Sequence, residues 1–343
     1  MFSYYLGAGW PLIPGASTFF GARGSVFTGI LLCFATAALL ATPAALLFTS
    51  NRSKLPFAVA GMFLLTAIPP LGIIGWGSPF LSAGVLFPGT AWWGFIGILA
   101  LVPLLRRFPL RTAVFAAPLA LLANGLYKSP SPPAGWQGVN TEFGGAGQAD
   151  PDFLAEFDAH QQMQEAIRQS NAQVLLFPEH VVTQWNEATD TFWQGSLDNL
   201  AKRHATLLIG VGLPRPRRPH FTAGRRTYYN ALITKGQDTA TVYYQRIPVP
   251  IAMWKPFSAD GVPLNLFGPG TIFVHDQRAA VLICYEQLLI WPFLSSEFEH
   301  PTILITVAND YWAKRTPIPK IQNASASSLA RLFGLPVLSA VNQ

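Results

Sequence analysis

The sequence predicts a membrane α-helical bundle over residues 1–127, followed by a layered α/β domain. The first observation behind this prediction is charge: all 17 acidic residues follow Lys128, so the net charge of +6 arises in the front segment. A soluble segment of that length without a carboxylate would be hard to keep in water. A bilayer segment needs none, because buried charge is expensive there. The second observation is that this segment is built from long apolar runs.

Four uncharged apolar runs are the candidate spans, and a crossing helix needs about 20 such residues. Pro69 and Pro70 are expected to kink the second run, and Trp92 and Trp93 open the third in the manner of an interfacial anchor. The sequence therefore predicts about four transmembrane helices. The runs are residues 25–49, 55–76, 90–105 and 112–127.

The basic residues of the front segment predict its orientation. They cluster at 52–54 and 106–111, whereas the loop between them, residues 77–89, has no charge. The positive-inside rule places both basic loops in the cytoplasm. With four spans, the domain after Tyr127 is then outside, which is the periplasm of a Gram-negative cell. We therefore predict a multi-pass protein of the inner membrane whose partner is the lipid bilayer.

A Pro-, Gly- and Ser-rich stretch at 128–147 is expected to be a linker, and residues 148–343 are expected to form one α/β domain. A helical, charged rhythm covers 152–170. Short apolar runs alternate with such segments, which is typical of buried strands in a layered α/β domain. The expected strands are residues 174–177, 207–211, 231–234, 280–283 and 303–307.

Polar residues that carry chemistry follow three of these strands. Glu179, Cys284 and Asn309 each stand at or just after a strand end, where α/β folds converge side chains on one edge. Cys33 lies in the membrane segment, so no disulfide with Cys284 is expected. A thiol is a nucleophile only as the thiolate, and Glu179 could be its base. Taken alone, such a Cys is more often a packing residue, and such a Glu more often a turn residue.

The three motifs together resemble a known family. Leu-Leu-Phe-Pro-Glu-His at 175–180, Val-Leu-Ile-Cys-Tyr-Glu at 281–286 and Ile-Thr-Val-Ala-Asn-Asp-Tyr-Trp at 305–312 follow the order and spacing of the nitrilase (carbon–nitrogen hydrolase) superfamily. The resemblance covers roughly 135–343. With its membrane segment, the chain resembles the apolipoprotein N-acyltransferase branch and, over its whole length, that branch's plasmid conjugal-transfer members. The resemblance implies an αββα sandwich and a Glu–Lys–Cys triad.

Five site residues carry over from this resemblance. Glu179 matches the general base and Cys284 the nucleophile. Tyr285 and Glu286 match residues beside the nucleophile that shape the acyl pocket. Trp312 matches an aromatic side chain near the lipid-binding site.

The triad Lys does not carry over. The matching stretch reads Tyr-Tyr-Gln-Arg-Ile-Pro-Val-Pro at 243–250, which puts Gln245 at the Lys position, or Arg246 after a shift of one residue. Neither is equivalent, because Arg stays protonated in a planar fork and Gln is a neutral donor. Lys255 is a further candidate cation. The family also continues beyond the strand in which this chain ends, so either the protein is naturally shortened or the sequence is partial.

Two functional classes therefore stay open. In the first, a Cys-dependent acyl-transfer or amide-cleaving enzyme acts in conjugal transfer on an acyl-lipid or lipoprotein substrate. In the second, a degenerate nitrilase-like domain serves as an assembly module for other conjugation proteins. No motif for a metal, cofactor or nucleic acid appears. The arginine-rich run at 214–226 is either a solvated loop or a contact for anionic lipid or a protein.

Overall fold

The computed structural model describes the whole chain except residues 21–24, 52, 145–152, 216–226, 240 and 259. Most of the arginine-rich run, together with Arg23 and Arg52, lies outside the described residues. The described chain divides into two units. We call them the helical unit (Met1–Ser131, Gln287–Leu294 and Arg315–Pro336) and the sheet unit (Pro132–Glu286, Ser295–Lys314 and Val337–Gln343).

The helical unit begins with a series of apolar helices. Two of them, α3 and α7, are long and apolar enough to cross a membrane by length and composition, whereas α4 and α6 are shorter than a crossing usually needs. The expected kink at Pro69 is instead a helix end, since α4 stops at Ala67. The helices are α1 (Phe2–Gly9), α2 (Leu12–Phe19), α3 (Val26–Leu46), α4 (Leu55–Ala67), η2 (Leu71–Ile73), η3 (Pro79–Leu81), α5 (Ser82–Leu86), α6 (Trp92–Arg107) and α7 (Pro109–Leu126).

A late helix of the chain, α11 (Ile318–Phe333), belongs to this same unit. Ser328 donates a hydrogen bond to the carbonyl of Leu81, and Arg331 donates to Oδ1 of Asn124 at 2.8 Å. Gly84 is required where α5 meets α11, because a Cβ there would collide with the carbonyl of Ser328. The units are therefore not the two consecutive segments that the composition suggested.

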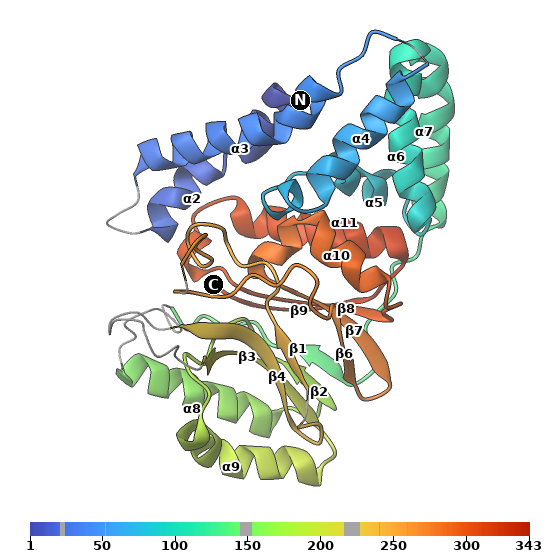
Figure 1. The fold of residues 1–343 in the computed structure, drawn as a ribbon. Helices are drawn as coiled ribbons and strands as arrows, with labels where there is room; N and C mark the ends of the chain where they lie inside the picture. The colour runs from blue at the N-terminus through green and yellow to red at the C-terminus, as the bar shows by residue number, and fades with distance from the viewer. Residues whose placement is uncertain (21–24, 52, 145–152, 216–226, 240, 259) are drawn as a thin grey trace. The chain divides into compact units, whose positions relative to one another are not determined.

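Two sheets form the centre of the sheet unit (Figure 1). One has the order β1-β2-β3-β4-β5, parallel as far as β3 and antiparallel from there. The other has the order β6-β7-β8-β9 and is parallel from β7 to β9. The strands are β1 (Trp136–Gly138), β2 (Val174–Leu176), β3 (Thr206–Pro214), β4 (Tyr228–Gly236), β5 (Val242–Tyr244), β6 (Thr271–Val274), β7 (Gln277–Ile283), β8 (Ile303–Asn309) and β9 (Val337–Asn342).

The apolar runs of the sequence fill two cores. Leu176, Leu208 and Val281 belong to the core that both sheets share, and Leu175 and Leu207 point to the other face of the first sheet. This alternation follows from the two-residue period of a strand. All five expected strands are present, because nearly continuous apolar runs mark strands that are buried on both faces.

Two helices, α8 (Phe153–Gln169) and α9 (Glu187–Lys202), pack on the outer face of the five-stranded sheet (Figure 1). Met163 and Ile167 are four residues apart, so they share the buried side of α8. Asn186 caps α9 by accepting from the amide of Thr189 at 3.1 Å. The helix expected over 152–170 is therefore present.

Strand β1 lies inside the stretch that was expected to be a linker. Its three residues pair with β2, and Thr141 then donates its N–H to the carbonyl of Val341 at 3.0 Å, next to β9. A three-residue strand among Pro and Gly residues is too short to show a periodic pattern, which is why composition indicated a linker. These contacts bring the start of the sheet unit to the carboxyl ends of β8 and β9.

Candidate active site

Strand ends place the candidate catalytic pair. Glu179 follows β2, and Cys284 follows the last residue of β7 and opens η4 (Cys284–Leu288). The main chain of Cys284 has φ of 50°, in the left-handed region that side chains other than Gly rarely adopt. Such strain persists where surrounding contacts hold it, and it is frequent at functional sites.

Glu179 and Cys284 form a buried pair, and the charge of the Glu179 carboxylate acts on the Cys284 thiol. Only 5% of Glu179 and 7% of Cys284 is exposed. Oε1 of Glu179 accepts from the side-chain amide of Asn230 at 2.6 Å, and Oε2 accepts from the main-chain N–H of Asn309 at 2.8 Å. The three strand-end residues singled out from the sequence are thus brought together. Their catalytic role stays a prediction.

The electrostatic potential at this pair of side chains is negative. Burial, and then the charge of Glu179 and that of Asp310, raise the pKa of the Cys284 thiol well above its ordinary value. Burial also raises the pKa of Glu179, although its two hydrogen-bond donors oppose this. The thiol therefore keeps its proton at neutral pH unless a base or a cation intervenes.

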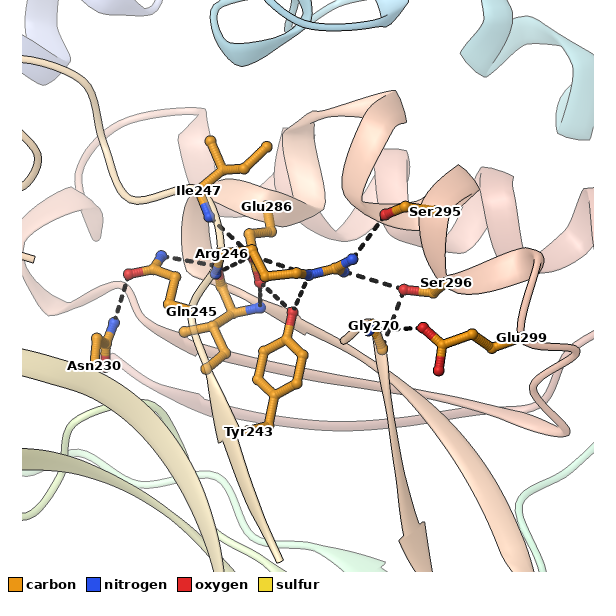
Figure 2. A network of polar contacts seen from close by, with 11 residues as sticks. Asn230, Tyr243, Gln245, Arg246, Ile247, Gly270, Glu286, Ser295, Ser296 and Glu299 are labelled. Atoms are coloured by element: carbon orange, nitrogen blue, oxygen red, sulfur yellow. Dashed lines mark hydrogen bonds and ion pairs between the residues drawn. The ribbon is translucent and has the colours of Figure 1, made fainter. Parts of the chain in front are cut away.

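Gln245 occupies the place next to this pair, after the end of β5. Its Oε1 accepts from the same Asn230 amide at 2.9 Å, and its Nε2 donates to the carbonyl of Ile283 at 3.2 Å (Figure 2). Gln245 is therefore hydrogen-bonded to Asn230, which also bonds Glu179, and to Ile283, the residue before Cys284. It brings a neutral amide where the family resemblance implies a cation.

Arg246 has its guanidinium in a different network (Figure 2). Its nitrogens donate to the Tyr243 hydroxyl at 2.8 Å, to Ser295 at 2.7 Å and to Ser296 at 3.0 Å. Its Nε also lies 3.8 Å from a carboxylate oxygen of Glu286. This geometry engages the charge of Arg246 with Glu286 and the α10 serines, so the contacts support Gln245 as the residue at the family Lys position.

Glu286 accepts several hydrogen bonds at the centre of this network. It is fully buried, and its carboxylate accepts from the main-chain N–H groups of Arg246 at 2.7 Å, Ile247 at 3.1 Å and Ile283 at 2.8 Å. The Tyr243 hydroxyl donates to it at 3.1 Å. These contacts tie the loop of Gln245 to the strand that precedes Cys284. The expected place of Glu286 beside the acyl pocket stays a prediction.

The remaining candidates are less closely tied to the pair. Tyr285 is half-buried within η4, and burial raises the pKa of its hydroxyl. Trp312 is half-buried in η5 (Tyr311–Ala313), the turn after β8. The ammonium of Lys255 forms no hydrogen bond or ion pair with any residue in the described ranges. Their expected roles at the site stay predictions.

Three residues near the pair were not singled out from the sequence. Asn230 joins Glu179 to Gln245. Tyr228, two residues earlier on the same face of β4, has its pKa raised to about 12 by burial and then by the charges of Glu179 and Cys284. Asp310 has its pKa raised to about 7 by burial and then by Glu179. Asp310 belongs to the third motif, which could have indicated it. Nothing in the sequence marked Tyr228 or Asn230.

A thiol and a carboxylate after strand ends of two stacked sheets form the arrangement that the family resemblance implies. Residues 145–342, more than half of the chain, match the carbon-nitrogen hydrolase family, and the chain belongs to that family. The nitrilase-like fold and superfamily expected from the motifs are thereby confirmed. Within this part of the chain, no group of three or more His, Cys, Asp or Glu among the described residues is arranged to hold a metal ion.

Two similar proteins indicate which members of the family this chain resembles. The chain is 29% identical to "Probable conjugal transfer protein TraB" of Sinorhizobium fredii, over 99% of this chain and 86% of that protein. It is also 29% identical to "Conjugal transfer protein TraB" of Agrobacterium fabrum, over 99% and 81%. The resemblance to conjugal-transfer members of the superfamily is therefore confirmed.

More distant relatives match part of the chain. Apolipoprotein N-acyltransferase of Azotobacter vinelandii is 27% identical over 47% of this chain and 33% of its own length. Among solved structures, a double mutant of the amidase from Nesterenkonia sp. AN1 in complex with acrylamide aligns with a TM-score of 0.39 and 12% identity. That alignment covers 62% of this chain and 79% of the amidase.

Proposed function

We propose that this protein is a membrane-anchored carbon-nitrogen hydrolase family member which acts in plasmid conjugal transfer through a Cys-dependent acyl-transfer or amide-cleaving site. The observation that carries the enzymatic part is the buried Glu179 carboxylate, held by Asn230 and Asn309 where its charge acts on the buried Cys284 thiol. The conjugal role is supported by similarity to the two TraB proteins over almost the whole chain.

The chemistry proceeds in two steps. Glu179 takes the thiol proton as the sulfur of Cys284 bonds to the acyl carbon, and the proton then passes to the leaving amine or alcohol as the bond to it breaks. Water or an amine next attacks the thioester and gives its proton to Glu179. The carbon–sulfur bond breaks, and the proton returns to sulfur. The burial that raises the pKa of Glu179 brings this carboxylate closer to the range of a useful base.

Membrane anchoring is supported by the helical unit. Every residue of α7 is exposed or half-buried, including Leu110, Phe115 and Leu121, and α3 exposes Phe27 and Leu31. Apolar side chains left uncovered over whole helices are typical of contact with lipid. The charge pattern then orients the sheet unit towards the periplasm. An acyl-lipid or lipoprotein substrate suits a protein that is anchored in the membrane.

The proposal is tested by conjugal transfer frequency in cells that express Cys284→Ser or Glu179→Gln at normal membrane levels. Loss of a covalent nucleophile costs orders of magnitude in catalysis, so both variants should lower transfer sharply. Mass spectrometry of the purified protein should find an acyl group on Cys284. Transfer near the wild-type level with both variants, against a clear defect on deletion, would sink the enzymatic role.

A second function is favoured by a specific observation. Gln245 stands where the family resemblance implies Lys, and the field of Glu179 and Asp310 disfavours the thiolate. Both features suit a domain that has lost catalysis and serves as an assembly module for other conjugation proteins. In that case cells that express Cys284→Ser would show a normal conjugal transfer frequency. Cells that express variants with a disturbed surface of the sheet unit would show a lower one.

A further inference from the structure

Asp310 is a buried carboxylate beside the candidate pair that the chemistry above does not use. Only 2% of it is exposed, and its Oδ1 has no hydrogen-bond partner among the described residues. Glu286 is buried as deeply, but four donors serve its carboxylate. Leaving a buried carboxylate oxygen unpaired is costly. Such an atom near the candidate pair indicates a ligand group that completes the site.

Asp310 is close to both members of the pair. It follows Asn309, whose main-chain N–H donates to Glu179 at 2.8 Å. Its charge is among the causes that raise the pKa of Cys284, and Glu179 in turn raises the pKa of Asp310. The two carboxylates and the thiol are thus close enough for their charges to affect one another. Within the described residues, no cationic side chain is bonded to any of the three.

The missing partner must be a cation with hydrogen-bond donors. Ca²⁺ and Mg²⁺ take about six or more oxygen ligands, Zn²⁺ sites usually have at least three protein ligands, and the described residues hold no metal-binding group of three or more acidic, His or Cys side chains. A primary ammonium is compact and carries three donors. It fits one unpaired oxygen of Asp310 and the neighbouring carboxylate of Glu179.

We propose that Asp310, together with Glu179, forms a subsite for a primary ammonium group carried by the substrate, and that this group supplies the positive charge which Gln245 does not. The inference rests on the proposed function of the Glu179–Cys284 pair. The substrate class is an acyl compound with a primary amine near the reacting carbonyl, such as an aminoacyl group.

The ammonium stays protonated throughout and no bond to it changes. It stabilises the Cys284 thiolate and the oxyanion that forms when sulfur attacks the carbonyl. The thiol proton goes to Glu179, as in the steps above. Cys284 keeps 7% of its surface exposed.

The first experiment measures alkylation of Cys284 by iodoacetamide in the full-length protein at pH 8 and constant ionic strength. Methylammonium chloride is added, with tetramethylammonium chloride as a control of equal charge that lacks N–H donors. An opposite charge within about 4–6 Å moves a pKa by about 1 unit or more. Methylammonium should therefore accelerate alkylation saturably, by about tenfold, and tetramethylammonium should not.

Two variants locate the effect. Asp310→Asn should abolish the methylammonium response and also raise the rate without added amine, because one repulsive charge near the thiolate is gone. A merely structural Asp would not give this combination. Glu297→Gln is the matched control, since Glu297 is another buried carboxylate with an unpaired oxygen, on α10 (Ile290–Glu297). It should respond as the wild type does.

A second arm separates a substrate-borne amine from a free one. Acylation of Cys284 by the p-nitrophenyl esters of glycine and of acetate is followed by mass spectrometry. The ratio of glycyl to acetyl transfer should fall about tenfold in Asp310→Asn, and methylammonium should raise acetyl transfer in the wild type. An unchanged ratio with a normal methylammonium response would assign the site to a free ammonium ion and overturn the substrate assignment.

Other outcomes also overturn the inference. They are a response without saturation, an equal response to tetramethylammonium, and a full response in Asp310→Asn. Acceleration by Mg²⁺ or Ca²⁺ in place of methylammonium would make this a metal site. Failure of the proposed function is distinct: Glu179→Gln would then be alkylated as fast as the wild type without any amine.

Discussion

The main-chain N–H of Asn309 donates a hydrogen bond to Oε2 of Glu179 at 2.8 Å. This single bond joins the end of β8, in the four-stranded sheet, to Glu179, three residues after β2 of the five-stranded sheet. Cys284 directly follows β7, the strand beside β8, so the bond also fixes Glu179 near the thiol. The candidate site therefore depends on how the two sheets face each other.

Replacing Glu179 with Gln should slow alkylation of Cys284 at neutral pH. The two side chains are nearly isosteric, so the change removes a base while packing is kept. General-base assistance typically contributes 10²–10⁴-fold, and we expect a loss of at least about tenfold in labelling by iodoacetamide. Glu187→Gln, at an exposed position of α9, is the control. Equal labelling of folded wild type and Glu179→Gln would make Cys284 a structural cysteine.

Replacing Gln245 with Lys should raise thiol reactivity. A buried ammonium next to Asn230 would favour both the Glu179 carboxylate and the Cys284 thiolate, and a nearby opposite charge lowers a thiol pKa by about 1–3 units. Labelling of Cys284 should accelerate by about tenfold or more at pH 7. Gln245→Met, of similar length and without charge, separates the cation from the loss of the amide. Equal acceleration in both variants would contradict the prediction.

Asp310 should make stability depend on pH. Its pKa is raised from 3.8 to about 7 in the folded protein, so the folded state holds the proton more tightly than the unfolded state. The stability contribution is complete below pH 3.8 and is lost as pH rises through about 7. The advantage of Asp310→Asn over the wild type should grow between pH 5 and 8, by up to about 3 kcal/mol at about 1.4 kcal/mol per pH unit.

Thermal unfolding followed by circular dichroism in detergent measures this difference. The exposed substitution Asp158→Asn on α8 is the control and should show no such trend. A constant gap between Asp310→Asn and the wild type from pH 5 to pH 8 would mean that Asp310 does not titrate in this range.

The Arg246–Glu286 network should be essential for folding. Arg246→Met leaves the buried Glu286 carboxylate without its cation, which typically costs about 3–5 kcal/mol. Arg246→Lys should recover little, because Lys lacks the planar fork that reaches Tyr243, Ser295 and Ser296. The double variant Arg246→Met with Glu286→Gln should lose less than the sum of the single variants, measured by denaturant unfolding. Strict additivity would argue against coupling.

The topology can be tested with reporter fusions. Alkaline phosphatase fused after Ser129 should be active, because the charge pattern places the following domain outside the cytoplasm. A reporter that works only in the cytoplasm should be active after Lys54. Inactive phosphatase at Ser129, with normal expression and insertion, would overturn the periplasmic orientation.

The sequence alone determined the composition of the two segments and the strands of the sheet unit. Apolar runs such as those before Cys284 and Asn309 are local signals, because a strand buried on both faces must be apolar at almost every position. The three motifs also indicated the family, since each places a reactive side chain at a strand end. Short strands such as β1 and β5 were not predicted from the sequence, because three residues cannot show a period.

Only the tertiary structure decided which side chains of the candidate site contact one another. The register of β4 places Tyr228 and Asn230 by the pair, and the contacts of Arg246 direct its charge to Glu286 while Gln245 stays next to Asn230. The tertiary structure also groups α11 with the N-terminal helices, and it shows that the buried Oδ1 of Asp310 has no hydrogen-bond partner among the described residues. These are relations between residues far apart in the chain. Local periodicity carries no information about them, because they arise when separate strands and helices pack against one another.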